Sequence, residues 1–209
     1  MTALGRDEKR QVAAEVALAL LEAMRTTDLP ADRLKDEDVR LTMPRRLGLS
    51  AVVDRQIALF RERVRQGLRM TADEFAEFIR LVMRRPDAAE VFFTMGSQLA
   101  GRKVRRVTRW LPRVLRLYLT RKRITTALRK LFGRRLGGFG SGSFTFEMSA
   151  SPLVQVDPNG DACEMITGFC QRALQESVGG GLVVAKRQCE TRGDRACRWT
   201  VDVSTRGKA

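Results

Sequence analysis

Apolar residues recur at helical spacing through most of the first hundred positions of the chain. This pattern predicts four helices, over residues 7–25, 51–66, 71–85 and 87–102. The third carries a capping-box sequence, with Thr71 at its start and Glu74 three residues later, and Pro86 follows its end. Residues 28–46 are polar and interrupted by prolines, so we interpret them as a linker. No strand is predicted before residue 100.

The second half of the chain changes to a pattern of strands around one helix. Residues 143–149 alternate apolar and polar side chains, which is typical of a half-buried strand. Residues 161–177 have helical spacing and end at a glycine run, and strands are expected over 181–189 and 196–203. Residues 137–142 (GGFGSG) are interpreted as a flexible turn, because a dinucleotide-binding loop would follow a strand and open a helix. The expected fold class is α+β, with a helical N-terminal half and a C-terminal antiparallel sheet packed with helices.

Composition limits what the chain can be. Its 209 residues are 44% hydrophobic, which is enough for a substantial core. No run of eighteen apolar residues occurs, and Glu15 interrupts the first apolar stretch, so neither a bilayer-spanning helix nor a signal peptide is expected. We therefore expect a cytoplasmic protein. The absence of histidine excludes serine–histidine catalysis, histidine-ligated haem and any zinc site with a histidine ligand.

Positive charge is concentrated in one segment. The net charge is +15, and residues 102–135 contain fourteen lysines or arginines and no acidic residue. Trp110 and Tyr118 are interleaved with arginines there, which suits peripheral association with the headgroups of an anionic membrane. Alternatively, the apolar side packs into the core and the arginines are solvated. Nucleic acid is a less favoured partner, because no recognised binding module accompanies the charge. The candidate contacts to an anionic surface are Arg109, Arg113, Arg116, Arg121, Lys122 and Arg123.

Four cysteines raise the question of a disulfide, a metal site or small core residues. Cys189 and Cys197 are symmetric about Gly193, so a hairpin would bring them face to face. Cys163 and Cys170 lie two helical turns apart, about 10 Å along the axis. Both cannot reach one zinc ion, which needs each sulfur within about 2.3 Å. One helix cysteine plus the hairpin pair is the most compact set, and spacing leaves open which helix cysteine joins. A cytosolic location lowers the expectation of a disulfide.

The stretch CEMITGFCQRALQESVGGGLVVAKRQCETRGDRACRWTVDV, residues 163–203, resembles the 4-vinyl reductase domain family. The matching features are a cysteine at a helix start, a glycine five residues on, a glycine turn, a strand and C-x7-C, and the resemblance extends over about residues 90–203. It implies the fold of transport protein particle subunits and haem nitric-oxide-binding domains. Residues 1–88 then form a helical extension, and residues 89–204 form a domain that encloses a pocket for an aromatic, porphyrin-like or acyl ligand. The implied wall residues are Phe144, Phe146, Met148, Phe169 and Trp199.

The resemblance also implies a zinc site. In phenol-sensing members, zinc is held by three cysteines that match Cys163, Cys189 and Cys197 and by a glutamate three residues before the first hairpin cysteine. Lys186 stands at the glutamate position here. Glu164, Glu190 or water would then complete a zinc site, so zinc is a candidate cofactor. We favour the alternative, a metal-free packed cysteine cluster.

These observations favour a non-enzymatic protein. The chain has no nicotinamide or flavin fingerprint, no phosphate loop and no distinctive acid–base pair. We expect a small-molecule-binding or scaffold protein that binds a hydrophobic ligand, docks on an anionic surface through its basic segment, or does both. The alternatives are a membrane-tethering assembly subunit without a ligand and an accessory protein related to tetrapyrrole vinyl reduction. A homodimer or hetero-assembly is expected in either case.

Overall fold

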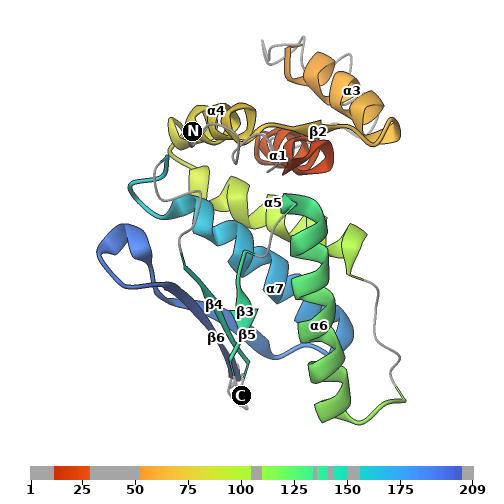
Figure 1. Cartoon of the computed structure of the whole chain (residues 1–209), viewed down its shortest axis with the longest axis vertical. Coiled ribbons are helices and arrows are strands. Elements are labelled where there is room, and N and C mark those ends of the chain that lie inside the picture. Colours follow the sequence, from red (N-terminus) through yellow and green to blue (C-terminus); the bar gives the residue numbers. More distant parts are fainter. Residues whose placement is uncertain are drawn as a thin grey trace, which may run out of the picture.

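The computed structural model describes residues 12–28, 52–104, 110–133, 136–140, 144–149 and 156–203. Nearly all of the predicted linker at 28–46 and the candidate Arg109 lie outside the described residues. The described part is α+β, with six α-helices and two antiparallel sheets, which confirms the predicted fold class (Figure 1).

The described N-terminal residues contain three helices, α1 (Ala14–Thr27), α3 (Val52–Arg65) and α4 (Ala72–Met83). The capping box at the start of α4 is present as predicted, because Thr71 Oγ1 accepts from Glu74 N and Glu74 Oε2 accepts from Thr71 N. The prediction of no strand was wrong in one detail. The short strands β1 (Val12–Ala13) and β2 (Arg69–Met70) pair antiparallel, since the turn after α3 returns the chain beside the start of α1.

The C-terminal sheet has the order β3-β4-β6-β5, with every neighbouring pair antiparallel. Its strands are β3 (Gly138–Phe139), β4 (Thr145–Met148), β5 (Leu182–Gln188) and β6 (Cys197–Val203). Strands β4, β5 and β6 were predicted. The flexible turn predicted at 137–142 is partly wrong, because Phe139 pairs with Phe146 and its ring packs 4.5 Å from that of Phe144.

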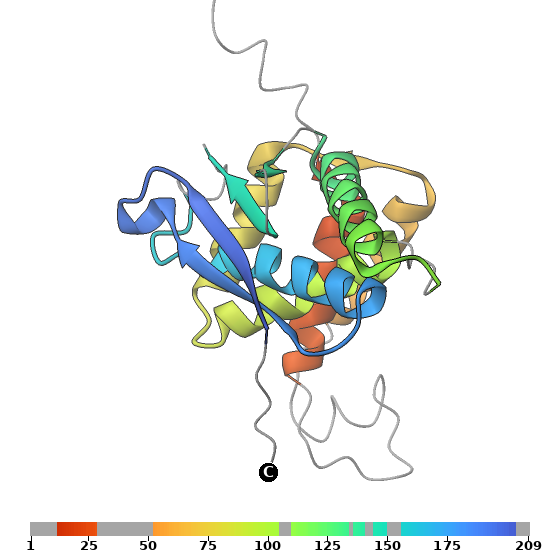
Figure 2. The ribbon, with the colours of Figure 1, turned by 90° about the horizontal axis from the view of Figure 1, so that it is seen from below.

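Helices cover one face of this sheet in successive layers. The first layer is α7 (Glu164–Ser177), preceded by the 3₁₀ turn η2 (Asp161–Cys163), with α6 (Arg113–Phe132) beside it. Helix α5 (Ala88–Lys103) packs on α7, and α1 packs on α5 (Figure 1). In Figure 2 the sheet and α6 stand on opposite sides, with α7 reaching from one to the other. One hydrophobic core runs from α1 to the sheet, so the N-terminal helices share the core of the C-terminal part.

Two glycines determine how closely α5 and α7 approach. A Cβ atom on Gly96 would overlap the carbonyl oxygen of Met165, and one on Gly168 would overlap the carbonyl oxygen of Phe93. The two backbones are therefore in contact, which only glycine permits at these positions. This crossing fixes α7, and with it the position of Cys163 at the start of α7.

Candidate functional site

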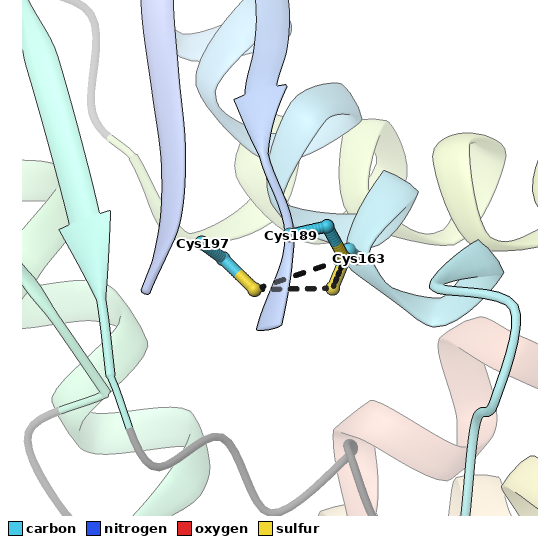
Figure 3. A group of neighbouring side chains, drawn as sticks. All are labelled: Cys163, Cys189 and Cys197. Carbon is cyan, nitrogen blue, oxygen red and sulfur yellow. Dashed lines mark hydrogen bonds between the residues drawn. The ribbon is translucent and has the colours of Figure 1, made fainter. Parts of the chain in front are cut away.

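Three of the four cysteines meet in a triangle, which we call the cysteine triangle: Cys163, Cys189 and Cys197 (Figure 3). The Sγ–Sγ distances are 3.8 Å between Cys163 and Cys197 and 3.9 Å for the other two pairs. All three are free thiols and at most 1% exposed. Cys170 is also buried but lies outside the triangle. Of the two helix cysteines, the structure therefore selects Cys163, as the resemblance implies.

The β5–β6 connection brings Cys189 and Cys197 together. Cys189 follows β5 and Cys197 begins β6, with the 3₁₀ turn η3 (Glu190–Arg192) and Gly193 between them. Gly193 has φ +92°, a left-handed conformation that favours glycine. Asp194 Oδ2 accepts from the backbone N–H of Cys189 at 2.8 Å and closes the turn. The predicted hairpin is confirmed, and a helical turn rather than a tight turn forms its tip.

Asp157 positions Cys163, the third member of the cysteine triangle. The sequence analysis did not predict this role of Asp157. Its side chain is fully buried, and its two oxygens accept from four successive backbone N–H groups, those of Asn159, Gly160, Asp161 and Ala162. An aspartate followed by Pro-Asn-Gly is a turn signal that could have revealed this role. The next residue after this loop is Cys163, so Asp157 sets where its sulfur lies.

A half-buried ion pair lies beside the triangle. Lys186 Nζ is 2.7 Å from Glu164 Oε1 and donates to the carbonyl oxygen of Gly160 at 2.9 Å. Burial opposes the charged amine, but the hydrogen bond from Lys186 to Glu164 and the charges of Glu164, Cys163 and Cys189 outweigh it and raise the pKa of Lys186. Lys186 is therefore a cation at neutral pH, and it holds Glu164 as its partner.

The surroundings shift the pKa values of two cysteines of the triangle in opposite directions. The hydrogen bond between Cys163 and Cys197, together with that from the backbone N–H of Glu190 at 3.3 Å, lowers the pKa of Cys197 to about 6 despite its burial. The same hydrogen bond to Cys197, together with burial, raises the pKa of Cys163. Burial alone raises the pKa of Cys170, which is an ordinary core thiol.

The zinc site implied by the resemblance fits this geometry only in part. A tetrahedral zinc ion with bonds of about 2.3 Å needs sulfurs about 3.8 Å apart. The three Sγ–Sγ distances of 3.8–3.9 Å meet that requirement. Among the described residues, however, no fourth histidine, cysteine or carboxylate joins the group. Lys186 occupies the neighbourhood of the missing ligand and pairs with Glu164. The chain therefore provides three metal ligands and lacks the fourth.

The five predicted pocket residues all lie in the hydrophobic core. Phe144, Phe146, Met148, Phe169 and Trp199 are all buried. The rings of Phe146 and Trp199 are 5.9 Å apart, and Trp199 Nε1 donates to Thr167 Oγ1 on α7. A cleft of about 570 Å³ lies elsewhere, between the C-terminal halves of α5 and α7, and polar side chains such as Gln98 and Arg172 line it. Binding of a hydrophobic ligand by these five residues stays a prediction.

The six predicted surface cations differ in their surroundings. Arg113 and Lys122 are exposed on α6. Arg116 is half-buried, and its Nη1 donates to the carbonyl oxygen of Ser177 at 3.5 Å. Arg121 donates to the carbonyl oxygen of Gly140 and lies 5.2 Å from the ring centroid of Phe139, so it ties α6 to β3. Arg123 is half-buried, and Arg109 is not among the described residues.

The apolar residues of α6 divide into two sets. Before and within its first turns, Trp110 is 80% exposed, Val114 81%, Leu115 42% and Tyr118 60%. From residue 120 onward, the apolar residues are core: Ile124, Ala127, Leu128, Leu131 and Phe132 are buried. The N-terminal end of α6 extends past α7 (Figure 1). The alternative that the apolar side packs into the core therefore holds for the second half of α6 and for Leu117, whereas Trp110, Val114, Leu115 and Tyr118 are exposed.

Comparison of the chain with protein-family models, curated proteins and solved structures found no match. The resemblance to the 4-vinyl reductase domain family therefore rests on the quoted residues and stays a prediction. Within the described ranges, no helix has both the length and the apolar character needed to cross a membrane. What the structure itself defines is an α+β protein with a buried cysteine triangle and an exposed apolar–basic helix end.

Proposed function

We propose that the protein is a non-enzymatic scaffold that docks on an anionic membrane surface through the N-terminal end of α6. The observation that carries the proposal is the exposure of Trp110, Val114, Leu115 and Tyr118 among basic residues. An exposed apolar group of this size in a basic setting is typical of an interaction site. The second half of α6 is anchored in the core, so the docking end is held rigidly.

Lipid headgroups fit both properties of this surface. Trp and Tyr side chains prefer the boundary between headgroups and acyl chains, and Val114 and Leu115 can enter the upper acyl region. Each lysine or arginine near an anionic surface contributes about 1 kcal/mol, and salt weakens that contribution. Arg113 and Lys122 are exposed on this helix, and no acidic residue occurs between positions 102 and 135 to oppose them.

Only the end of α6 is available for docking. Arg116 and Arg121 are held by contacts within the protein, and the residues from Ile124 onward are core. The protein would therefore touch the bilayer with one helix end, in a shallow contact. A phosphate backbone of nucleic acid would use the charge but leave the aliphatic side chains without a partner, so it is the weaker candidate.

The test is co-sedimentation with two vesicle types, phosphatidylcholine alone and phosphatidylcholine mixed with phosphatidylglycerol, each at low and at near-physiological salt. The wild-type protein should bind the anionic vesicles, and this binding should persist at near-physiological salt. Trp110→Ala/Tyr118→Ala should weaken binding at both salt concentrations, and Arg113→Glu/Lys122→Glu should abolish it. Arg192→Glu/Arg195→Glu is the matched control, because it changes the same charge in the exposed β5–β6 connection.

Two outcomes would contradict the proposal. One is tight binding to duplex DNA with indifference to both vesicle types. The other is equal loss of vesicle binding in the Arg192/Arg195 control, which would mean that total charge, and not the end of α6, drives association. Binding to neither target would leave the exposed surface for a protein partner and would also overturn the membrane assignment.

A further inference from the structure

We propose that the cysteine triangle is a three-coordinate thiolate site for a soft monovalent ion, Cu(I), and is not a four-coordinate zinc site. This inference concerns a different part of the molecule from the docking surface and does not depend on it. It rests on the distances between the sulfurs, on the groups that surround them, and on the donor atoms that the chain offers.

The shape of the triangle suits three bonds in one plane. The three Sγ–Sγ distances are nearly equal, at 3.8, 3.9 and 3.9 Å. The point in the plane that is equidistant from the sulfurs lies about 2.2 Å from each, close to the length of a metal–thiolate bond. An ion at that point is bound without movement of any sulfur. A tetrahedral ion would sit about 0.6 Å out of the plane and would need a fourth ligand on that side.

The surroundings of the triangle supply no fourth ligand. The chain has no histidine, and among the described residues no carboxylate or fourth thiol lies within reach of the three sulfurs. A charged group beside them is the ammonium of Lys186, held by Glu164 and by the Gly160 carbonyl. Closed structural zinc sites are almost always four-coordinate, so this set of side chains is incomplete for zinc.

Crowding and burial also disfavour water as a fourth ligand. The three cysteines are at most 1% exposed. The backbone of Gly160 approaches so closely that a Cβ atom there would lie 2.8 Å from Cys189 Sγ. Gly160 has φ +79°, so this close approach also depends on glycine. The sulfurs are therefore closed in by protein atoms, as a three-coordinate site requires.

The donor set and its charges favour a soft monovalent ion. Soft thiolate ligands suit Cu(I), zinc and iron–sulfur clusters, and a trigonal set without a fourth ligand favours Cu(I) over zinc, which takes four ligands in structural sites. The Lys186 ammonium repels a divalent ion about twice as strongly as a monovalent ion at the same place. The backbone N–H of Glu190 contacts Cys197 Sγ at 3.3 Å, and Thr191 Oγ1 lies 3.0 Å from Cys189 Sγ, so hydrogen bonds support the thiolates.

The first experiment uses the reduced wild-type protein without oxygen and needs no variant. Cu(I) is titrated against a competing Cu(I) chelator, and zinc is titrated against a chelating zinc indicator. We expect one Cu(I) per chain, three sulfur neighbours at about 2.2 Å by X-ray absorption, and zinc left on the indicator. Zinc held at one equivalent against the indicator, or Cu(I) with only two sulfur neighbours, would overturn the proposal.

Variants then test the reason for the preference. Lys186→Glu replaces the ammonium with a carboxylate, so its zinc affinity should rise about tenfold or more while one Cu(I) still binds. Cys189→Ser and Cys197→Ser should each lose the Cu(I), and Cys170→Ser is the control that should retain it. Unchanged zinc affinity in Lys186→Glu, measured on protein with the wild-type circular dichroism spectrum, would show that Lys186 does not set the choice of ion. Loss of Cu(I) in Cys170→Ser would contradict the assignment of ligands.

Discussion

Helices α6 and α7 lie side by side, but α7 is enclosed by the protein whereas the start of α6 is exposed. Helix α7 is enclosed by the sheet and α5, and Asp157 fixes the loop at its start with four hydrogen bonds. Helix α6 begins after Pro112 without a side-chain cap and exposes apolar residues over its first turns. The difference teaches that α7 positions the interior of the protein, including the cysteine triangle, whereas the start of α6 is available to an outside partner.

The largest effect is expected where α7 meets α5. Gly96→Ala places a methyl group on the carbonyl of Met165 in α7, so the helices must separate. We expect a loss of about 3 kcal/mol or more in the free energy of unfolding, measured by chemical denaturation. Gly101→Ala on the same helix is the control, since a Cβ there meets only the Arg172 side chain at 3.9 Å, and it should leave stability unchanged or slightly raised. Equal effects of the two changes would disprove the close crossing.

The next largest effect is a difference in stability between substitutions in the two halves of α6. Leu128→Ala removes a buried side chain and should lower the free energy of unfolding by about 2–5 kcal/mol. Leu115→Ala removes the same atoms from an exposed position and should change stability by less than about 0.5 kcal/mol. Vesicle binding should respond in the opposite order, with Leu115→Ala the weaker binder. A large loss of stability in Leu115→Ala would mean that the start of α6 is core after all.

A smaller effect is expected at the start of α7. Asp157→Asn keeps one oxygen but replaces the other with an N–H₂ group that faces backbone donors, so about 2 kcal/mol of stability should be lost. Because the loop positions Cys163, the affinity of the cysteine triangle for Cu(I) should fall as well. The comparison variant is Asp161→Asn, whose side chain is only half-buried. Unchanged Cu(I) affinity in Asp157→Asn would remove its assigned role in placing Cys163.

The smallest effect is a difference in acid sensitivity. Burial alone would raise the pKa of Glu22 on α1, but hydrogen bonds from Arg102 and Arg61 outweigh it and lower the pKa. A lowered pKa in the folded state gives stability that is present above the ordinary glutamate pKa and is lost as pH falls through the folded value. The arginines are partly exposed, so we expect the free energy of unfolding to fall by about 1 kcal/mol or less on acidification. This loss should be absent in Glu22→Gln.

The same pH range should leave the docking surface unaffected. Residues 102–135 contain no acidic side chain, so no group there gains a proton between pH 7 and pH 4. Binding to phosphatidylglycerol vesicles should therefore stay constant while the folded fraction stays constant. A fall in vesicle binding before any unfolding would show that an acidic group elsewhere takes part in docking.

Local patterns allowed much of the fold to be predicted. The capping box at Thr71 and Glu74, the alternation in β4 and the β5–β6 hairpin are set by neighbours in the sequence, and all three are present. Strand β3 was missed because its glycines indicate a turn locally. Its strand conformation depends on the pairing of Phe139 with Phe146, which no local pattern contains.

The candidate sites were less predictable because they depend on where the helices end in space. The two halves of α6 have a similar mixture of apolar and basic residues, and contacts with elements distant in sequence, such as that of Phe75 in α4 with Phe132, bury the second half. Similarly, spacing could not choose between Cys163 and Cys170. That choice depends on the loop held by Asp157, which places the start of α7 against the hairpin.

The crossing of Gly96 and Gly168 also constrains how the chain is made. Residue 96 leaves the ribosome long before residue 168, and α6, β3 and β4 are synthesised between them. The side of α5 around Gly96 therefore stays without its α7 partner during elongation, and the contact forms only when the long loop between the two helices closes. We expect ribosome-bound chains that stop before residue 160 to remain open to protease within α5, and chains that expose residue 177 to become resistant there.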